Sequence, residues 1–258
     1  MDLKLKHKHF IVTGSSSGFG RAIVERLLEE GAGVTGNARA EEKLQEIQDK
    51  YPDQFSYVAG DITMLETMDQ LIAVAYERKT TGIVINAGGP PAKSFLETNM
   101  DDWDEAYRSI LRWKVDLAKR MTEYFMQANY GKMVFIESAS MKQPMENLVL
   151  STSTRLAVAG FVKTLAKEVA AIKITANLLA PGFHDTAALN RIFLKKSQNL
   201  NISVEEAREN TVKTIPVKQI GEPSDFASLA VWLLSPLSCY VTGQTFSVDG
   251  GSIDYLFG

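Results

Sequence analysis

The sequence predicts a single α/β domain built on a doubly wound parallel sheet. The chain has 258 residues, 45% hydrophobic and 23% charged, with a formal net charge of -3. Short β-branched runs alternate with longer amphipathic segments, which is the pattern of parallel strands joined by right-handed helical crossovers. A glycine-rich turn follows the first of these runs. Because no linker, repeat or low-complexity tract divides the pattern, we expect residues 1–258 to form one domain.

Seven strands and six helices are expected in regular alternation. The strands are the short apolar runs His9–Thr13, Gly33–Asn37, Phe55–Ala59, Gly82–Asn86, Lys132–Glu137, Lys173–Leu179 and Thr245–Val248. The helices are the amphipathic segments Gly18–Gly31, Ala40–Tyr51, Leu65–Glu77, Met100–Tyr130, Ser151–Ala171 and Pro223–Ser235. This order predicts a sheet that is covered by helices on both faces.

The segment from Phe183 to Gly221 departs from the alternation. It contains no predicted strand, and its helical patches, at 191–196 and Ser203–Val212, are polar. An insertion after the carboxyl end of a strand is where α/β folds place ligands and lids. We therefore expect a substrate lid at about residues 183–221, with a surface excursion of no such role as the alternative.

Composition excludes several classes of protein. The single cysteine, Cys239, cannot form a disulfide framework, and we expect it to be a buried structural thiol. The net charge near zero does not favour a nucleic-acid partner. No apolar run approaches the roughly 18 residues that span a membrane, and no secretory signal is evident, so a cytoplasmic location is expected.

The turn after the first strand has the composition of a phosphate-binding site. The segment Thr13-Gly14-Ser15-Ser16-Ser17-Gly18-Phe19-Gly20 leads directly into the first helix. Glycines allow a tight turn and a close approach of the backbone to a ligand, and a helix N-terminus offers free N–H groups to a diphosphate. The alternative is a tight connection without a ligand. Its position after the first strand of an alternating pattern favours a dinucleotide site.

The end of the second strand distinguishes between two cofactors. An acidic residue at this place holds the ribose 2′-hydroxyl of NAD, whereas an arginine accommodates the 2′-phosphate of NADP. The strand ends in Asn37-Ala38-Arg39, and no acidic residue lies between Gly31 and Ala40. Because a guanidinium binds phosphate through two parallel hydrogen bonds, Arg39 favours NADP over NAD, unless it is simply an exposed loop arginine.

Further motifs occur in a fixed order along the chain. After the glycine-rich turn come Asp61-Ile62, Ile85-Asn86-Ala87-Gly88, Ala180-Pro181-Gly182 with Thr186, and Val248-Asp249-Gly250-Gly251. In this combination the sequence resembles the short-chain dehydrogenase/reductase family, and in particular its 3-oxoacyl-carrier-protein reductases, over practically the whole chain. The resemblance implies a Rossmann-type sheet, a nicotinamide cofactor, a carbonyl or alcohol substrate, and a homotetramer or homodimer.

The resemblance also implies which residues hold the cofactor. They are Gly14, Ser16, Ser17, Gly18, Phe19, Arg39, Asp61, Ile62, Asn86, Ala87, Gly88, Arg155, Pro181, Gly182 and Thr186.

The catalytic residues that the resemblance implies are an Asn, a Ser, a Tyr and a Lys. Ser138, after the strand that ends at Glu137, fits the family's Ser. Where the family has Tyr, thirteen positions further on, this chain has Ser151, and where it has Lys the chain has Arg155. The Asn position is Ile110. The expected site therefore keeps one member of the family's tetrad.

These replacements change the proton chemistry of the site. A serine hydroxyl is a much poorer proton donor or acceptor than a tuned tyrosine, and an arginine, which stays protonated in proteins, cannot act as a base. Arg155 can still donate hydrogen bonds to ribose hydroxyls. Lys142, in the loop after Ser138, is a candidate proton donor, with a solvated loop lysine as the alternative. His184 is a second candidate, with a wall of the substrate pocket or a surface residue as the alternatives.

Three functions are compatible with these observations. The first is an NADP(H)-dependent oxidoreductase in which Ser138, Ser151, Arg155 and Lys142 form the active site. The second is a non-catalytic dinucleotide-binding or regulatory protein. The third is a protein that uses the fold for assembly alone. No His, Cys or carboxylate cluster has the spacing of a metal site, so we expect no metal.

Overall fold

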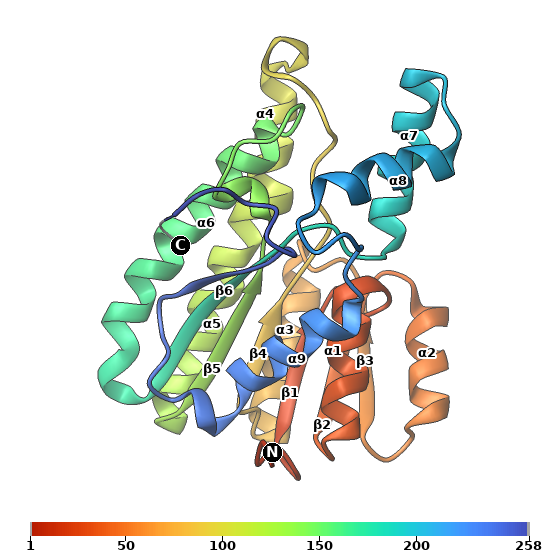
Figure 1. Cartoon of the computed structure of the whole chain (residues 1–258). Coiled ribbons are helices and arrows are strands. Elements are labelled where there is room, and N and C mark those ends of the chain that lie inside the picture. Colours follow the sequence, from red (N-terminus) through yellow and green to blue (C-terminus); the bar gives the residue numbers. More distant parts are fainter. Residues whose placement is uncertain (1, 257–258) are drawn as a thin grey trace.

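The fold is a seven-stranded parallel sheet, shown in Figure 1 by a computed structural model that describes residues 2–256. The strand order is β3-β2-β1-β4-β5-β6-β7, and every neighbouring pair is parallel. The predicted fold class is thus confirmed. The strands are β1 (His9–Thr13), β2 (Gly33–Ala38), β3 (Phe55–Ala59), β4 (Gly82–Ile85), β5 (Gly131–Ile136), β6 (Ile174–Pro181) and β7 (Thr245–Val248).

Helices cover both faces of the sheet. One face carries α1 (Gly18–Glu29), α2 (Glu41–Lys50) and α9 (Pro223–Leu234), whose buried side chains form one apolar cluster with the strands. The opposite face carries α3 (Leu65–Arg78), α5 (Trp113–Ala128) and α6 (Val149–Val169), which form a second cluster. The helices predicted from periodicity therefore cover both faces of the sheet as expected, because an apolar stripe must pack against the sheet.

The long helix predicted over residues 100–130 is divided into three parts. It consists of α4 (Met100–Ala106), a π-helix over Tyr107–Arg112, and α5. The π-helix packs against α6 and contains Ile110, which is buried. π-helices are rare and occur frequently at functional sites, and this one contacts α6.

The segment predicted to be a lid forms two helices beyond the carboxyl ends of the strands (Figure 1). Helix α7 covers Ala187–Leu200 and helix α8 covers Val204–Thr214. They share a small apolar cluster that includes Phe193 and Ile215, separate from the two clusters on the sheet. The predicted helical patches are therefore helices, and their packing lets this segment form its own unit beside the sheet.

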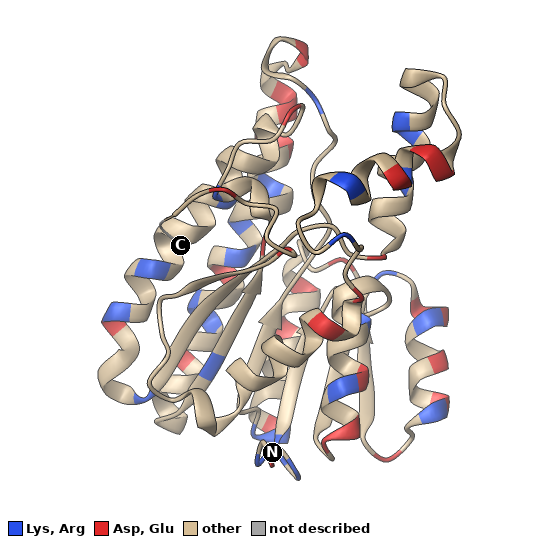
Figure 2. Cartoon of the chain, viewed as in Figure 1, with Lys and Arg blue, Asp and Glu red and all other residues tan. Residues whose placement is uncertain are grey.

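The surface carries both signs of charge along the outer helices (Figure 2). Within residues 2–256, no helix combines the length and the apolar character needed to cross a membrane.

The expectation that Cys239 is buried is wrong, because its side chain is exposed. The neighbouring Ser238 is the buried residue of this turn, where its hydroxyl donates to the carbonyl of Leu233.

His9, at the start of β1, is part of a polar row across three strands. Its ring nitrogens lie 2.8 Å from Thr80 Oγ1 and 3.0 Å from Thr35 Oγ1, and the Thr35 hydroxyl contacts Ser56 on β3. Burial, with a smaller contribution from the charge of Arg78, lowers the pKa of His9 to about 4. The folded protein therefore holds this ring in the neutral form.

We expect His9 to make stability fall with acidification. Between about pH 6.5 and pH 4 the unfolded chain binds a proton that the folded chain does not, so unfolding becomes easier as the pH is lowered. From pH 7 to pH 4, the parent should lose roughly 3 kcal/mol more unfolding free energy than His9→Gln, as measured by urea unfolding. His7→Gln, at an exposed position, should follow the parent curve. Parallel curves for the parent and His9→Gln would refute this role.

Candidate functional site

The candidate site lies where the strand order reverses. Strand β1 pairs with β2 on one side and with β4 on the other, so the crossovers from β1 and β4 leave in opposite directions. In open α/β sheets, ligands bind outside the carboxyl ends of the strands at such a point. The residues implied in cofactor binding follow or end β1, β2, β3, β4 and β6, apart from Arg155, so the fold gathers them at one edge.

The glycine-rich turn is tied to the end of β4. The Thr13 hydroxyl donates to the carbonyl of Asn86 at 2.7 Å and accepts from the Asn86 amide at 2.8 Å. Gly14 has a φ of +61°, and a Cβ at this position would lie 2.7 Å from the Asn86 side chain. A Cβ on Gly20 would lie 2.1 Å from the carbonyl oxygen of Gly14. The turn therefore requires glycine at both positions.

Helix α1 begins at this turn without a side-chain cap. Ser17, its N-cap residue, is extended and makes no capping hydrogen bond. The first N–H groups of a helix have no partner within the helix, and together with the helix dipole they attract an anion. Gly88, after β4, adjoins open space, because a Cβ on it would meet no atom within 4 Å. The turn, the helix end and this space fit a diphosphate-bearing dinucleotide.

Arg39 stands in solvent after β2. Its side chain is 82% exposed, and its nearest charged partner is Asp61, with 3.9 Å between Nη1 and Oδ2. The pKa of Asp61 is lowered, chiefly because the backbone and hydroxyl of Thr63 donate to its carboxylate. The guanidinium is therefore available to a ligand. Ile62, by contrast, is mostly buried in the apolar cluster beneath α3 and α5.

Ser151 and Arg155 are in direct contact on the first turns of α6. The Nε of Arg155 donates to the Oγ of Ser151 at 3.1 Å, and its Nη1 donates to Glu137 Oε2 at 2.8 Å. Ser138 follows Glu137 in the chain, and its Oγ accepts from the backbone N–H of Ser140 at 3.2 Å. Arg155 thus connects Ser151 to the buried Glu137 carboxylate, and Ser138 is the next residue in the chain after Glu137.

Lys114, on α5, completes this buried charged group. Its Nζ lies 2.5 Å from Glu137 Oε1, and its side chain is 1% exposed. Burial lowers the pKa of Lys114 to about 8, while the Glu137 carboxylate opposes the shift. We did not predict Lys114 or Glu137 as site residues. The only sequence signal is a charged residue at the end of an otherwise apolar strand and another on an apolar helix face.

The two candidate proton donors, Lys142 and His184, make no hydrogen bond to Glu137, Ser151 or Arg155 in the described chain. The Nζ of Lys142 donates to the backbone carbonyl of Thr245 on the edge strand β7 at 3.0 Å. His184 is buried, packs edge-on against Phe19 with ring centroids 5.0 Å apart, and also contacts Phe226. Burial lowers the pKa of His184, which favours the neutral ring. His184 is therefore a buried ring packed between aromatic side chains and not a surface residue.

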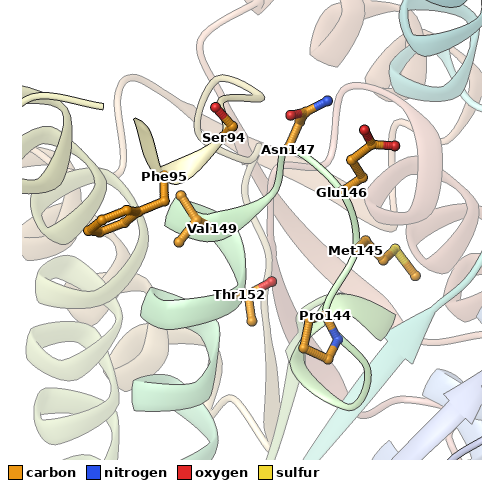
Figure 3. A pocket seen from close by; sticks show the side chains of 8 residues that line it. All are labelled: Ser94, Phe95, Pro144, Met145, Glu146, Asn147, Val149 and Thr152. Atoms are coloured by element: carbon orange, nitrogen blue, oxygen red, sulfur yellow. The ribbon is translucent and has the colours of Figure 1, made fainter. Parts of the chain in front are cut away.

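A pocket of about 360 Å³ opens at the N-terminus of α6 (Figure 3). Ser94 and Phe95 line it from the segment after β4, and the 144–147 loop and α6 line it from the other side. Both segments are joined by a parallel bridge between Lys93 and Leu148. The Oγ1 of Thr152 is buried at this pocket without a hydrogen-bond partner in the described chain.

The sheet, the reversal of strand order and the glycine turn define a single α/β domain of the Rossmann type. A family profile described as Enoyl-(Acyl carrier protein) reductase matches residues 14–252. The chain belongs to the short-chain dehydrogenase/reductase family.

Known relatives match over nearly the full chain. A 3-oxoacyl-(acyl-carrier-protein) reductase FabG of Vibrio cholerae is 30% identical over 251 residues, covering 96% of this chain and 98% of that protein. L-sorbose reductase from Gluconobacter frateurii, solved with NADPH and L-sorbose, has a TM-score of 0.92 at 25% identity and covers 99% and 100% of the two chains. Actinorhodin polyketide ketoreductase with NADPH has a TM-score of 0.90 at 27% identity, covering 96% and 98%.

Gly20→Ala tests whether the turn is as tight as it appears. The added Cβ overlaps a backbone oxygen that can move only if the turn opens, so we expect a loss of about 2 kcal/mol in unfolding free energy. Gly160→Ala, on an exposed face of α6 with no atom within 4 Å of the new Cβ, should gain up to about 1 kcal/mol. Guanidinium unfolding measures both, and equal effects of the two substitutions would contradict the geometry.

Proposed function

We propose that the protein is an NADP(H)-dependent oxidoreductase that acts on a carbonyl or alcohol substrate with an atypical active site. The observation that carries this proposal is the uncapped N-terminus of α1, in a turn that has room only for glycine at positions 14 and 20. The exposed Arg39 nearby supports NADP rather than NAD. The NADPH named with the two solved relatives supports the same choice.

The cofactor would lie along the gathered strand ends. The N–H groups of α1 and the Ser16–Phe19 segment would hold the diphosphate, and Arg39 would hold the 2′-phosphate. Asp61, Asn86, Ala87 and Gly88 would line the adenosine and ribose portions. Pro181, Gly182 and Thr186 would flank the nicotinamide. When bound, the nicotinamide supplies or accepts the hydride.

The two serines would stabilise charge on the substrate oxygen. Because Ser151 Oγ already accepts from Arg155 Nε, its own proton remains free to be donated. Ser138 Oγ likewise accepts from a backbone N–H and keeps its proton for donation. The Ser151 hydroxyl beside the Arg155 cation, together with the Ser138 hydroxyl, would stabilise a developing alkoxide without acting as a general acid. The net proton would then come from water, because the Lys142 ammonium already donates a hydrogen bond to the Thr245 carbonyl.

A non-catalytic dinucleotide-binding protein is the second candidate. It is favoured by the same site, because Arg155 cannot exchange a proton near neutrality and Ile110 offers no polar atom. General acid–base help is typically worth roughly 10²–10⁴ in rate, so its absence leaves binding intact and reduces turnover. Binding and turnover must therefore be measured separately.

Arg39→Ala tests the choice of cofactor. Loss of charge-assisted hydrogen bonds to the 2′-phosphate should raise the Kd for NADPH about 10- to 100-fold and leave the Kd for NADH within about threefold. Arg78→Ala, at an exposed arginine at the end of α3, is the matched control and should change neither. Fluorescence titration gives both constants. Equal weakening of NADPH and NADH by Arg39→Ala would contradict the assignment.

Turnover is tested by NADPH oxidation with 3-oxoacyl thioesters, ketones and aldehydes at high enzyme concentration. We expect measurable oxidation that falls about 100-fold in Ser138→Ala while the Kd for NADPH stays unchanged, because the hydroxyl acts in the transition state. Binding without oxidation by the parent, together with oxidation by the combined variant Ile110→Asn, Ser151→Tyr and Arg155→Lys, would establish the second candidate instead.

A further inference from the structure

Three charged side chains from three elements meet beneath the candidate site. Glu137 directly follows β5, Lys114 comes from α5, and Arg155 comes from α6. Their side chains are 0%, 1% and 7% exposed. Each oxygen of the carboxylate has its own cation, at 2.5 Å for Lys114 and 2.8 Å for Arg155. The carboxylate is thereby fixed in one rotational position.

The contacts of Arg155 leave one edge of its guanidinium open. Nε donates to Ser151 and Nη1 donates to Glu137, whereas Nη2 has no hydrogen-bond acceptor among residues 2–256. Nη2 lies 3.4 Å from the place where a Cβ on Gly89 would stand. Gly89 follows the Asn86–Gly88 segment at the end of β4, so the free nitrogen faces the strand edge where a dinucleotide would lie.

Stability alone does not explain this group of charges. Burying ions carries a large desolvation penalty, and replacing a buried ion pair with apolar side chains of similar size is often neutral or stabilising. The Glu137 carboxylate also holds a long, flexible arginine in a single orientation. A planar guanidinium held on two sides presents its third side in a fixed direction.

We propose that Glu137 is a positioning residue that aims Nη2 of Arg155 at the nicotinamide half of the dinucleotide, with Lys114 holding the second oxygen of the carboxylate. This inference rests on the proposed function. It assigns the buried acid a role that acts through Arg155 and not on the substrate. It also means that Arg155 and Glu137 act as one unit, so that either substitution alone removes the same interaction.

The test compares NADPH with 2′,5′-ADP, which carries the 2′-phosphate but no nicotinamide half. The Kd for 2′,5′-ADP divided by the Kd for NADPH, called the ratio below, reports on the nicotinamide half alone. The Kd for 2′,5′-ADP by itself reports whether the site remains folded. Three variants share the Lys114→Met background: Lys114→Met itself, the same with Glu137→Gln, and the same with Glu137→Leu. The amide oxygen of glutamine can still accept from Arg155, whereas leucine cannot.

We expect the parent to bind NADPH more tightly than 2′,5′-ADP. Lys114→Met should keep this ratio within about threefold, since the contact between Glu137 and Arg155 remains. Adding Glu137→Leu should reduce the ratio about tenfold and leave 2′,5′-ADP binding unchanged. Without the carboxylate, Arg155 is no longer held in place to donate its hydrogen bond to the nicotinamide half. Glu137→Gln should recover at least part of the loss. A ratio unchanged by Glu137→Leu would overturn the proposal.

An all-apolar variant separates positioning from folding. Lys114→Met, Glu137→Leu and Arg155→Met together remove all three charges and leave no unpaired ion. This variant should show the same reduced ratio as the Glu137→Leu variant with Arg155 present, since Glu137 acts only through Arg155. A clearly lower ratio in the all-apolar variant would overturn the proposal, because Arg155 would then act without Glu137. If the parent binds NADPH no more tightly than 2′,5′-ADP, the proposed function itself fails.

Discussion

The carboxyl ends of β1 and β4 lie side by side, and every candidate site residue is placed relative to this junction. The Thr13 hydroxyl fixes the junction by bonding both the amide and the carbonyl of Asn86, 73 positions away in the sequence. The glycine turn then passes so close to Asn86 that a Cβ on Gly14 has no room. The same contact that joins two strands of the sheet therefore also shapes the floor of the proposed nucleotide site.

The second organising feature is the Glu137 carboxylate. It is fully buried beside Ser138 and carries one cation on each oxygen. Ser151 and Arg155, which the proposed function places in the active site, are joined by a hydrogen bond from Arg155 Nε to Ser151 Oγ. A permanent cation held by a buried acid is suited to stabilising negative charge, whereas proton exchange near neutral pH is not available to it. The proposed chemistry is therefore electrostatic.

Most of the fold could be predicted from the sequence because the relevant signals are local. Apolar runs bounded by turns identified all seven strands, with β1, β3 and β7 at the predicted residues. Helix periodicity did not reveal the π-helix over Tyr107–Arg112, because the apolar pattern continues through it. The exposure of Cys239 also escaped prediction, since a lone cysteine carries no signal of its own burial.

The candidate site was only partly predictable. Motifs and the family resemblance indicate the glycine turn, Arg39, Ser138, Ser151 and Arg155 as candidate residues. They do not indicate the partners of Arg155, because Glu137 lies 18 positions before it and Lys114 lies 23 positions before Glu137. Such pairs are brought together only by the packing of α5 and α6 against β5. Lys142 is close to Ser138 in sequence, yet its ammonium group donates to the backbone carbonyl of Thr245 on the edge strand β7.

A crystal structure of the protein with NADPH would test the central claim most directly. The account predicts the diphosphate at the N-terminus of α1, the 2′-phosphate on Arg39, and Nη2 of Arg155 within hydrogen-bond distance of the nicotinamide ribose, with Ser138 and Ser151 beside the nicotinamide. A complex in which NADPH avoids the glycine turn, or in which Arg155 leaves Glu137 and points away from the nucleotide, would contradict it.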